Sequence, residues 1–219
     1  MKILKQLSKT ISKLTLILFF CTCSFANEPI DIWKIEKKDI INKENSTSNI
    51  NLVLVGMMGS GKTLIGKLIS KQTKLKFIDI DNKIEEKEKM KIAEIFKKKG
   101  EKYFRDCEEE ITLSCLKGEK QILSLGGGAY INTNIRKECK KSSFSFWLNW
   151  KKDIIIKRIN GSKKRPLAMT LSETDLERLI NERAKIYSLA DFTINCDQLN
   201  KNEIANKIIK KYEIKNNKG

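Results

Sequence analysis

The sequence predicts an α/β fold, in which a five-stranded parallel sheet carries helices on both faces. From Leu52 onward, short apolar runs typical of buried strands alternate with helical patterns. This alternation indicates parallel strands joined by right-handed crossovers. A glycine-rich stretch also joins the first strand to the first helix, and in such sheets ligands gather beyond the carboxyl ends of the strands.

The glycine-rich stretch begins directly after the first predicted strand, Leu52 to Val55. It reads G-x-x-x-x-G-K-[ST] from Gly56 to Thr63, a pattern in which backbone N–H groups and a helix start surround phosphates. The lysine reaches the β and γ phosphates, and the hydroxyl ligates Mg²⁺. The alternative is a chance glycine-rich turn. The nucleotide-binding residues that we expect here are Gly59, Ser60, Gly61, Lys62, Thr63 and Leu64.

The other elements follow in order along the chain. Gly100 separates two helical patterns, and a loop rich in glycine, serine, lysine and proline follows the fourth strand and its helix. The predicted elements are a strand at 76–80, helices at 92–99 and 101–116, strands in "QILSLGGGAY" and "SFSFWLNW", a helix at 153–159, a loop at 160–171, a helix at 175–189, a strand at 192–195 and a helix at 201–212.

Polar residues follow several of the predicted strands. Asp79 is placed to hold Mg²⁺ through water and so to complement Thr63, because hard cations prefer oxygen ligands. Asp81, two residues further on the same face of the strand, can point toward a phosphoryl acceptor. The alternative is a solvated strand end with a helix cap at Asp81. The run from Gly126 to Gly128 and Asn149 also follow strand ends, so we expect all of them in one crevice.

Composition narrows the chemistry. The chain contains no histidine, which excludes a Ser/His/Asp triad and histidine phosphotransfer. Its six cysteines lack metal-ligand spacing, which indicates buried or incidental thiols. The net charge of +17 comes from lysines spread over nearly every predicted helix. Such charges favour solvated faces and a positive field for anionic ligands over a nucleic-acid site.

The first fifty residues differ from the rest. Four lysines precede the apolar run from Leu14 to Phe20, and Ser24-Phe25-Ala26 resembles a cleavage site, so residues 1–26 are signal-like or an atypical hydrophobic segment. The run is short for a membrane span. Residues 27–49 are polar and predict a linker. Residues 50–219 then form the folded domain.

Six motifs occur in order over residues 50–212: "GMMGSGKT", "FIDID", "YFRDCEEE", "LSLGGGA", "KKRPLA" and "ERAKIY". In these motifs the chain resembles the shikimate kinases, within the nucleoside-monophosphate-kinase-like group of P-loop NTPase folds. The resemblance implies a lid loop at about 160–172 and transfer of the γ-phosphoryl group of ATP to the 3-hydroxyl of shikimate. The products would be 3-phosphoshikimate and ADP, in aromatic amino-acid biosynthesis, with Mg²⁺ as cofactor.

The resemblance also implies roles at the acceptor side. Arg105 and Arg183 would clamp the carboxylate of shikimate, a task suited to a bidentate guanidinium. Asp81 would bind ring hydroxyls and orient or deprotonate the attacking one. The N–H of Gly127 would approach the substrate, and Glu108 would orient Arg105 or cap the pocket. The alternative for Arg105 and Glu108 is an i,i+3 ion pair on a helix surface.

Two further arginines are implied at the nucleotide. Arg165, in the lid, would fold over the transferred phosphoryl group and join Lys62 and Asp81 as a catalytic residue. Arg158 would stack on adenine. The alternative for Arg165 is that it is one basic residue among three in an exposed loop. The alternative for Arg158 is that it is an ordinary surface arginine at the end of a helix. The sequence departs from the family in "CDQLNKNE" and at Lys185, where proline is common, which leaves adenine contacts from that region open.

Two rival functions stay open: a related small-molecule kinase such as a gluconate-type enzyme, and a nucleotide-binding module without catalysis. The expected partners are ATP and shikimate, with no nucleic acid and no stable membrane insertion of the core, and the expected state is a monomer. We expect a cytoplasmic protein because the reaction needs ATP. The signal-like segment conflicts with this, and a misread start, an inefficient signal or a membrane-surface anchor would each resolve the conflict.

Overall fold

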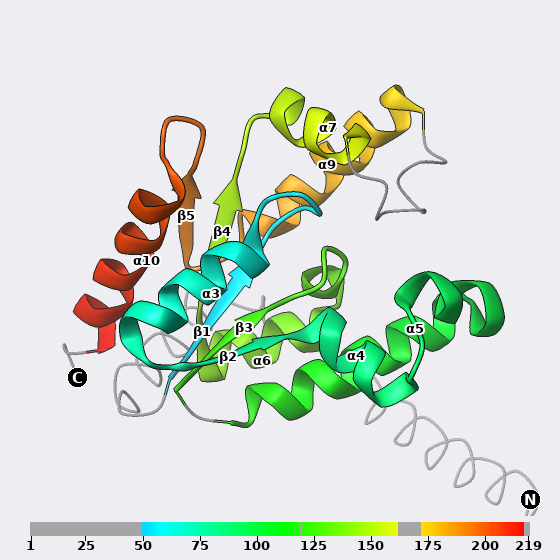
Figure 1. The fold of residues 1–219 in the computed structure, drawn as a ribbon, viewed down its shortest axis with the longest axis horizontal. Coiled ribbons are helices and arrows are strands. Elements are labelled where there is room, and N and C mark those ends of the chain that lie inside the picture. The colour runs from blue at the N-terminus through cyan, green and yellow to red at the C-terminus, as the bar shows by residue number, and fades with distance from the viewer. Residues whose placement is uncertain (1–49, 119, 162–171, 217–219) are drawn as a thin grey trace, which may run out of the picture. The chain divides into compact units, whose positions relative to one another are not determined.

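The computed structural model describes residues 50–118, 120–161 and 172–216. Within them, five strands form one parallel sheet in the order β2-β3-β1-β4-β5 (Figure 1). β1 lies at the centre because it pairs with both β3 and β4. The predicted five-stranded parallel sheet is therefore confirmed. The strands are β1 Asn51–Val55, β2 Lys76–Asp79, β3 Gln121–Ser124, β4 Ser143–Asn149 and β5 Phe192–Asn195.

Helices connect these strands and cover both faces of the sheet. The break that the sequence predicted at Gly100 is present as a kink, where Gly100 has φ 85° inside one long helix. The helices are α3 Lys62–Thr73, α4 Ile80–Glu88, α5 Ile92–Leu116, the 3-10 helix η1 Ala129–Ile131, α6 Thr133–Ser142, α7 Lys152–Asn160, α9 Glu173–Tyr187 and α10 Lys201–Asn216.

The central strand shows why the sheet has a hydrophobic core on each face. Its side chains alternate in direction, so Leu52 and Leu54 pack on one face while Val53 and Val55 pack on the other. The first face is covered by α3 and α10, which lie side by side (Figure 1). The second is covered by residues of α4, α5, α6, α7 and α9. Both cores lie on the faces of the sheet, and its carboxyl edge carries the loops that follow the strands.

The boundary after β2 differs from the prediction. The strand ends at Asp79, and α4 begins at Ile80, where the sequence predicted the strand to continue. Asp81 therefore lies in the first turn of a helix and not on a strand face. Oδ1 of Asp79 accepts from the backbone N–H groups of Asp81 at 3.1 Å and Asn82 at 3.5 Å. Asp79, and not Asp81, is thus the residue that caps this helix.

Two α-helices, α4 and α6, and the 3-10 helix η1 were not predicted. In α6 only Ile135 and Cys139, four residues apart, are buried, so the helical pattern is short and its other positions are polar. Asn132 begins the helix, because its side chain accepts from the N–H groups of Asn134 and Ile135. α10 also extends past the predicted end at Tyr212 to Asn216.

Several predicted features lie outside the described residues. They are the segments 1–26 and 27–49 and most of the predicted lid, 162–171, which includes Arg165. Cys107, Cys115, Cys139 and Cys196 are free thiols, three of them buried, in agreement with the prediction for these four. In the described part of the chain, no helix has the length and apolar character needed to cross a bilayer.

Candidate active site

The phosphate loop connects β1 to α3 at the carboxyl edge of the sheet. Gly59 and Gly61 have φ of 85° and 88°, a conformation in which a residue with a side chain would be strained. These two glycines let the backbone turn into the start of α3. The ammonium group of Lys62 is buried at this turn and donates to the carbonyl oxygens of Gly56 at 2.8 Å and Met57 at 3.1 Å. The loop thus holds a cation at the positive end of a helix, which is an arrangement suited to phosphates.

Beside the loop, a hydroxyl and a carboxylate from two elements meet. Oγ1 of Thr63 donates to Oδ2 of Asp79 over 2.7 Å. Both are hard oxygen donors, the type that Mg²⁺ prefers. In the described ranges no cluster of three or more His, Cys, Asp or Glu side chains could hold a metal by itself. Thr63 and Asp79 therefore fit an ion that takes its remaining ligands from a nucleotide and from water.

Asp81 is the most strongly perturbed acid at this edge of the sheet. Burial raises the pKa of Asp81 from 3.8 to about 6, opposed by Lys62 and reinforced by Asp79 and Glu108. At neutral pH the carboxylate is ionised, yet its pKa lies close enough to take up a proton. A carboxylate in this state can accept a hydrogen bond or a proton from a hydroxyl group.

The three glycines after β3 are the point at which the side chains of α4, α5 and α9 converge. A Cβ atom at Gly126 would lie 2.7 Å from a carboxylate oxygen of Asp81. At Gly127 it would lie 3.7 Å from Nη1 of Arg183, and at Gly128 only 2.8 Å from Cζ of Arg105. The structure therefore brings together an acid and two arginines that are far apart in the sequence, as the resemblance implied. A side chain at Gly126 or Gly128 would overlap with Asp81 or Arg105, whereas a Cβ atom at Gly127 would be in ordinary contact with Arg183 and closer to the backbone N of Met58, at 3.2 Å.

Arg105 and Glu108 form an ion pair on the inner side of α5. Nη1 of Arg105 donates to Oε2 of Glu108 at 2.7 Å, and the side chain of Glu108 is only 3% exposed. Burial raises the pKa of Glu108, while Arg105 opposes that rise. The alternative of an ion pair on the helix surface is thus wrong for Glu108. The pair fixes the direction of the Arg105 guanidinium, and Glu101 binds its outer side at 3.2 Å.

Arg183 reaches the phosphate loop from α9, and Nη1 of Arg183 lies 3.6 Å from Sδ of Met57. One turn later on the same helix, the buried hydroxyl of Tyr187 donates to the carbonyl oxygen of Gly127. Burial raises the pKa of Tyr187 to about 12, so the phenol keeps its proton at neutral pH. No role for Tyr187 was predicted from the sequence; its spacing of four from Arg183 was the available signal.

Arg158, Asn149 and Leu64 lie at the other side of the phosphate loop. Nη1 of the exposed Arg158 donates to the carbonyl oxygen of Gly59 at 3.3 Å, so this arginine does lie at the nucleotide loop. Leu64 is 51% exposed on the first turn of α3. The Asn149 amide donates to Oδ1 of Asn195 at 3.0 Å and so joins β4 to β5. Trp150, which follows Asn149 and donates to the carbonyl oxygen of Ser60 in the loop, was not predicted.

The parallel sheet, the phosphate loop and the acid beside it define a P-loop kinase. A model of the family described as "Shikimate kinase" matches residues 58–213, which is well over half of the chain. The chain therefore belongs to the shikimate kinase family. This confirms the resemblance in the six motifs.

Curated relatives agree with the family model. The chain is 41% identical over 160 residues to a shikimate kinase of Bartonella quintana (strain Toulouse), which covers 73% of this chain and 76% of the relative. It is 38% identical over 164 residues to a shikimate kinase of Thermodesulfovibrio yellowstonii, covering 74% of this chain and 95% of the relative. The match therefore spans most of both proteins in each case.

Solved structures confirm the fold class. A shikimate kinase of Acinetobacter baumannii in complex with shikimate superposes with a TM-score of 0.71 and 28% identity, covering 78% of this chain and 97% of that one. A shikimate kinase of Aquifex aeolicus gives a TM-score of 0.66 and 29% identity, covering 78% and 100%. The fold predicted from alternating strands and helices is thus that of solved shikimate kinases.

Proposed function

We propose that this protein transfers the γ-phosphoryl group of ATP to the 3-hydroxyl of shikimate, a step of aromatic amino-acid biosynthesis. Membership of the shikimate kinase family supports the reaction. One observation carries the assignment to this site: Asp81, Arg105 and Arg183 converge on the glycine run beside the phosphate loop. An acceptor that has both a carboxylate and hydroxyls matches this set of groups.

At the acceptor, Arg105 and Arg183 form the proposed carboxylate clamp. They approach the glycine run from different helices, so a planar carboxylate between them can receive two sets of N–H donors. Glu108 holds Arg105 in direction through the 2.7 Å bond. The N–H of Gly127 adds a backbone donor with no side chain in the way. Asp81 then binds the hydroxyl that attacks.

At the nucleotide, the proposed phosphate contacts are the N–H groups of the loop and the ammonium group of Lys62. Lys62 donates to loop carbonyls in the structure, and we expect it to turn to the β and γ phosphates of bound ATP. Thr63 and Asp79 would hold Mg²⁺, which supplies neutralisation of phosphate charge. Arg158 would stack on adenine. The proposed nucleotide contacts are Gly59, Ser60, Gly61, Lys62, Thr63, Leu64, Arg158 and Arg165.

In the proposed step, a bond forms between the 3-oxygen of shikimate and the γ-phosphorus while the bond from that phosphorus to the β-phosphate oxygen breaks. The proton of the hydroxyl passes to the carboxylate of Asp81, and ADP leaves. Lys62 stabilises the charge on the transferred group. Arg165, which lies outside the described residues, is proposed to join it there, while positioning and electrostatics supply the rate.

The proposed compartment is the cytoplasm, since the reaction consumes ATP. The proposed oligomeric state is a monomer, because each proposed contact comes from a single chain: the phosphate loop, α4, α5 and α9 all belong to it.

The proposed function is tested by identifying the product. The full-length protein is incubated with ATP and Mg²⁺ and with shikimate, gluconate or no acceptor, and phosphorus NMR follows the phosphate species. We expect a phosphomonoester and ADP in the mixture that contains shikimate, and neither product with gluconate or without an acceptor. Phosphorylation of gluconate would assign the site to a gluconate-type kinase, and bound ATP with no turnover in any mixture would indicate a binding module.

A further inference from the structure

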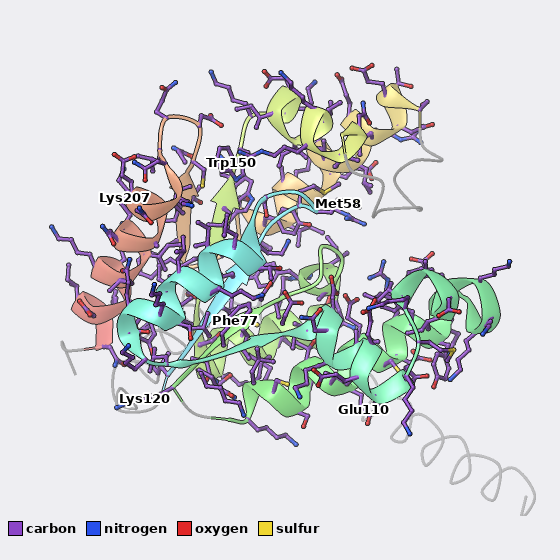
Figure 2. The ribbon with its side chains drawn as sticks, viewed as in Figure 1. Met58, Phe77, Glu110, Lys120, Trp150 and Lys207 are labelled. Atoms are coloured by element: carbon purple, nitrogen blue, oxygen red, sulfur yellow. The ribbon has the colours of Figure 1, made fainter. Side chains whose placement is uncertain are left out.

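Trp150 lies at the carboxyl end of β4, next to the phosphate loop (Figure 2). Its indole Nε1 donates to the carbonyl oxygen of Ser60 at 2.9 Å. The guanidinium of Arg158 lies over the indole ring, with Cζ 3.8 Å from the ring centroid. Arg158 in turn donates to the carbonyl oxygen of Gly59 at 3.3 Å. Two successive carbonyls of the loop are therefore held by one stacked pair of side chains.

We propose that Trp150 is a positioning residue for nucleotide binding, which fixes the phosphate loop through Ser60 and supports Arg158 as a platform for the purine ring. This inference rests on one part of the proposed function, which is that the site binds an adenine nucleotide. It does not depend on which acceptor is phosphorylated. The occupant of the platform is the flat base of an adenine nucleotide.

The bond to Ser60 bears on the loop because peptide groups are planar and trans. In such a group, the carbonyl oxygen and the following N–H point in opposite directions. Trp150 holds the carbonyl of Ser60 toward the indole, so the N–H of Gly61 is held pointing away from the indole. Backbone N–H groups of such loops are the groups that bind phosphates. Loss of the indole N–H would free this peptide group to rotate.

The stack on Arg158 bears on the base. A guanidinium is planar and has two faces, and it stacks favourably on aromatic rings. One face of Arg158 lies on the indole, and the side chain is exposed at the end of α7. A purine ring can therefore stack on the other face, with the cation between two aromatic systems. Without the indole, an exposed arginine would lose rotational freedom each time it binds the base.

Core packing alone does not account for these contacts. Trp150 packs against both hydrophobic cores, but that role needs neither its N–H nor a cation over its ring. Trp147, three residues earlier in β4, offers a matched comparison: it packs against one core, with its ring centroid 6.1 Å from that of Tyr187. The proposal therefore predicts different effects on the nucleotide from the same substitution at the two tryptophans.

The test measures ADP binding to the full-length protein by calorimetry in the absence of any acceptor, and shikimate binding in a separate titration. For Trp150→Ala we expect the ADP dissociation constant to rise by about tenfold, with shikimate affinity unchanged. Trp150→Phe keeps a ring under Arg158 but loses the N–H, so it should lie between wild type and Trp150→Ala. Trp147→Phe should leave ADP affinity unchanged.

Trp150→Ala and Arg158→Ala are then combined. If Trp150 acts through Arg158, the double variant binds ADP little more weakly than the weaker single variant. Fully additive losses would overturn the platform. Unchanged ADP affinity in Trp150→Ala, or equal losses of ADP and shikimate affinity together with a lower melting temperature, would overturn the whole proposal. ADP binding is measured without any acceptor, so its result does not depend on whether shikimate is the acceptor. Failure of the proposed function would instead appear as the absence of a phosphorylated product from shikimate.

Discussion

Asp81 has a carboxyl group whose pKa of about 6 lies well above its ordinary value of 3.8, chiefly because burial disfavours its charged form. Since the hydroxyl of the acceptor needs an ionised carboxylate, activity should depend on this ionisation. Lys62 works in the opposite sense and keeps the pKa from rising further. At pH 7 most of the molecules therefore carry the ionised form.

This ionisation predicts the pH profile. As pH falls below about 6, kcat/KM for shikimate should fall by about tenfold per pH unit, because Asp81 takes up a proton and can no longer accept one. The measurement is kcat/KM in buffers on both sides of that value. Asp81→Asn should be severely impaired, and its residual rate should lack this inflection. A wild-type profile that stays flat in this range would exclude Asp81 as the acceptor of the proton.

Tyr187 is the second residue whose effect can be isolated. Its hydroxyl binds the carbonyl oxygen of Gly127, so Tyr187→Phe keeps the ring and frees the glycine run next to both arginines. We expect KM for shikimate to rise by about fivefold, the scale of one hydrogen bond, with KM for ATP unchanged. Steady-state kinetics with each substrate varied in turn measures this.

Tyr212→Phe is the matched control, because the buried hydroxyl of Tyr212 also donates to a backbone carbonyl, that of Ile50 before the start of β1. This bond lies at the end of the strand opposite to the phosphate loop. Tyr212→Phe should lower stability without a change in KM for shikimate. An equal rise of KM in both variants would show that Tyr187 has no particular role at the site.

At the scale of elements, α4 and α5 are joined by a buried acid near the end of α4. The side chain of Glu88 is 6% exposed and accepts from Nζ of Lys99 at 2.5 Å and from the hydroxyl of Tyr103 at 3.0 Å. Lys99 and Tyr103 flank the kink at Gly100. This contact therefore sets the angle between the two halves of α5, and the second half carries Arg105.

Glu88→Gln should lower the melting temperature, because the amide loses the charge-assisted bond to Lys99. That bond lowers the pKa of Glu88, so its stabilising effect is present above pH 4.5 and is lost as pH falls. The difference in melting temperature should therefore shrink in acid. Glu86→Gln is the control, since Glu86 is exposed and pairs with Lys83 on the surface of the same helix. Equal shifts in the two variants would contradict the role of Glu88.

The elements also show where the sequence was informative. The phosphate loop is encoded within eight neighbouring residues, Gly56 to Thr63, and the apolar run from Leu52 to Val55 before it predicted its strand, so this part of the fold could be predicted from local sequence alone. The end of β2 was placed one residue too late because Ile80 continues the apolar pattern of the strand. What ends the strand is the side chain of Asp79, which caps α4, and an aspartate can serve equally as a metal ligand or as a cap.

At the scale of the whole molecule, the order of the strands decides which distant residues meet. The sequence placed Asp81 and the glycine run in one crevice because the ends of parallel strands share an edge. Arg105 and Arg183 were added to that crevice by the resemblance to the shikimate kinases. The sequence could not show that Trp150 binds Ser60 or that Tyr187 binds Gly127. These partners are 90 and 60 residues apart. They meet because β1 lies between β3 and β4, and this order of the strands cannot be predicted from a local sequence pattern.

The proposed reaction depends above all on binding of the shikimate carboxylate by the two arginines at the glycine run. Its most direct test is ADP release as a function of shikimate concentration in wild type, in Arg183→Ala and in Arg178→Ala. Arg178 lies on the same helix but is exposed and pairs with Asp175. We predict saturation in wild type and in Arg178→Ala, and a rise of KM for shikimate by about 100-fold in Arg183→Ala with KM for ATP little changed. Unchanged saturation by shikimate in Arg183→Ala would contradict the account.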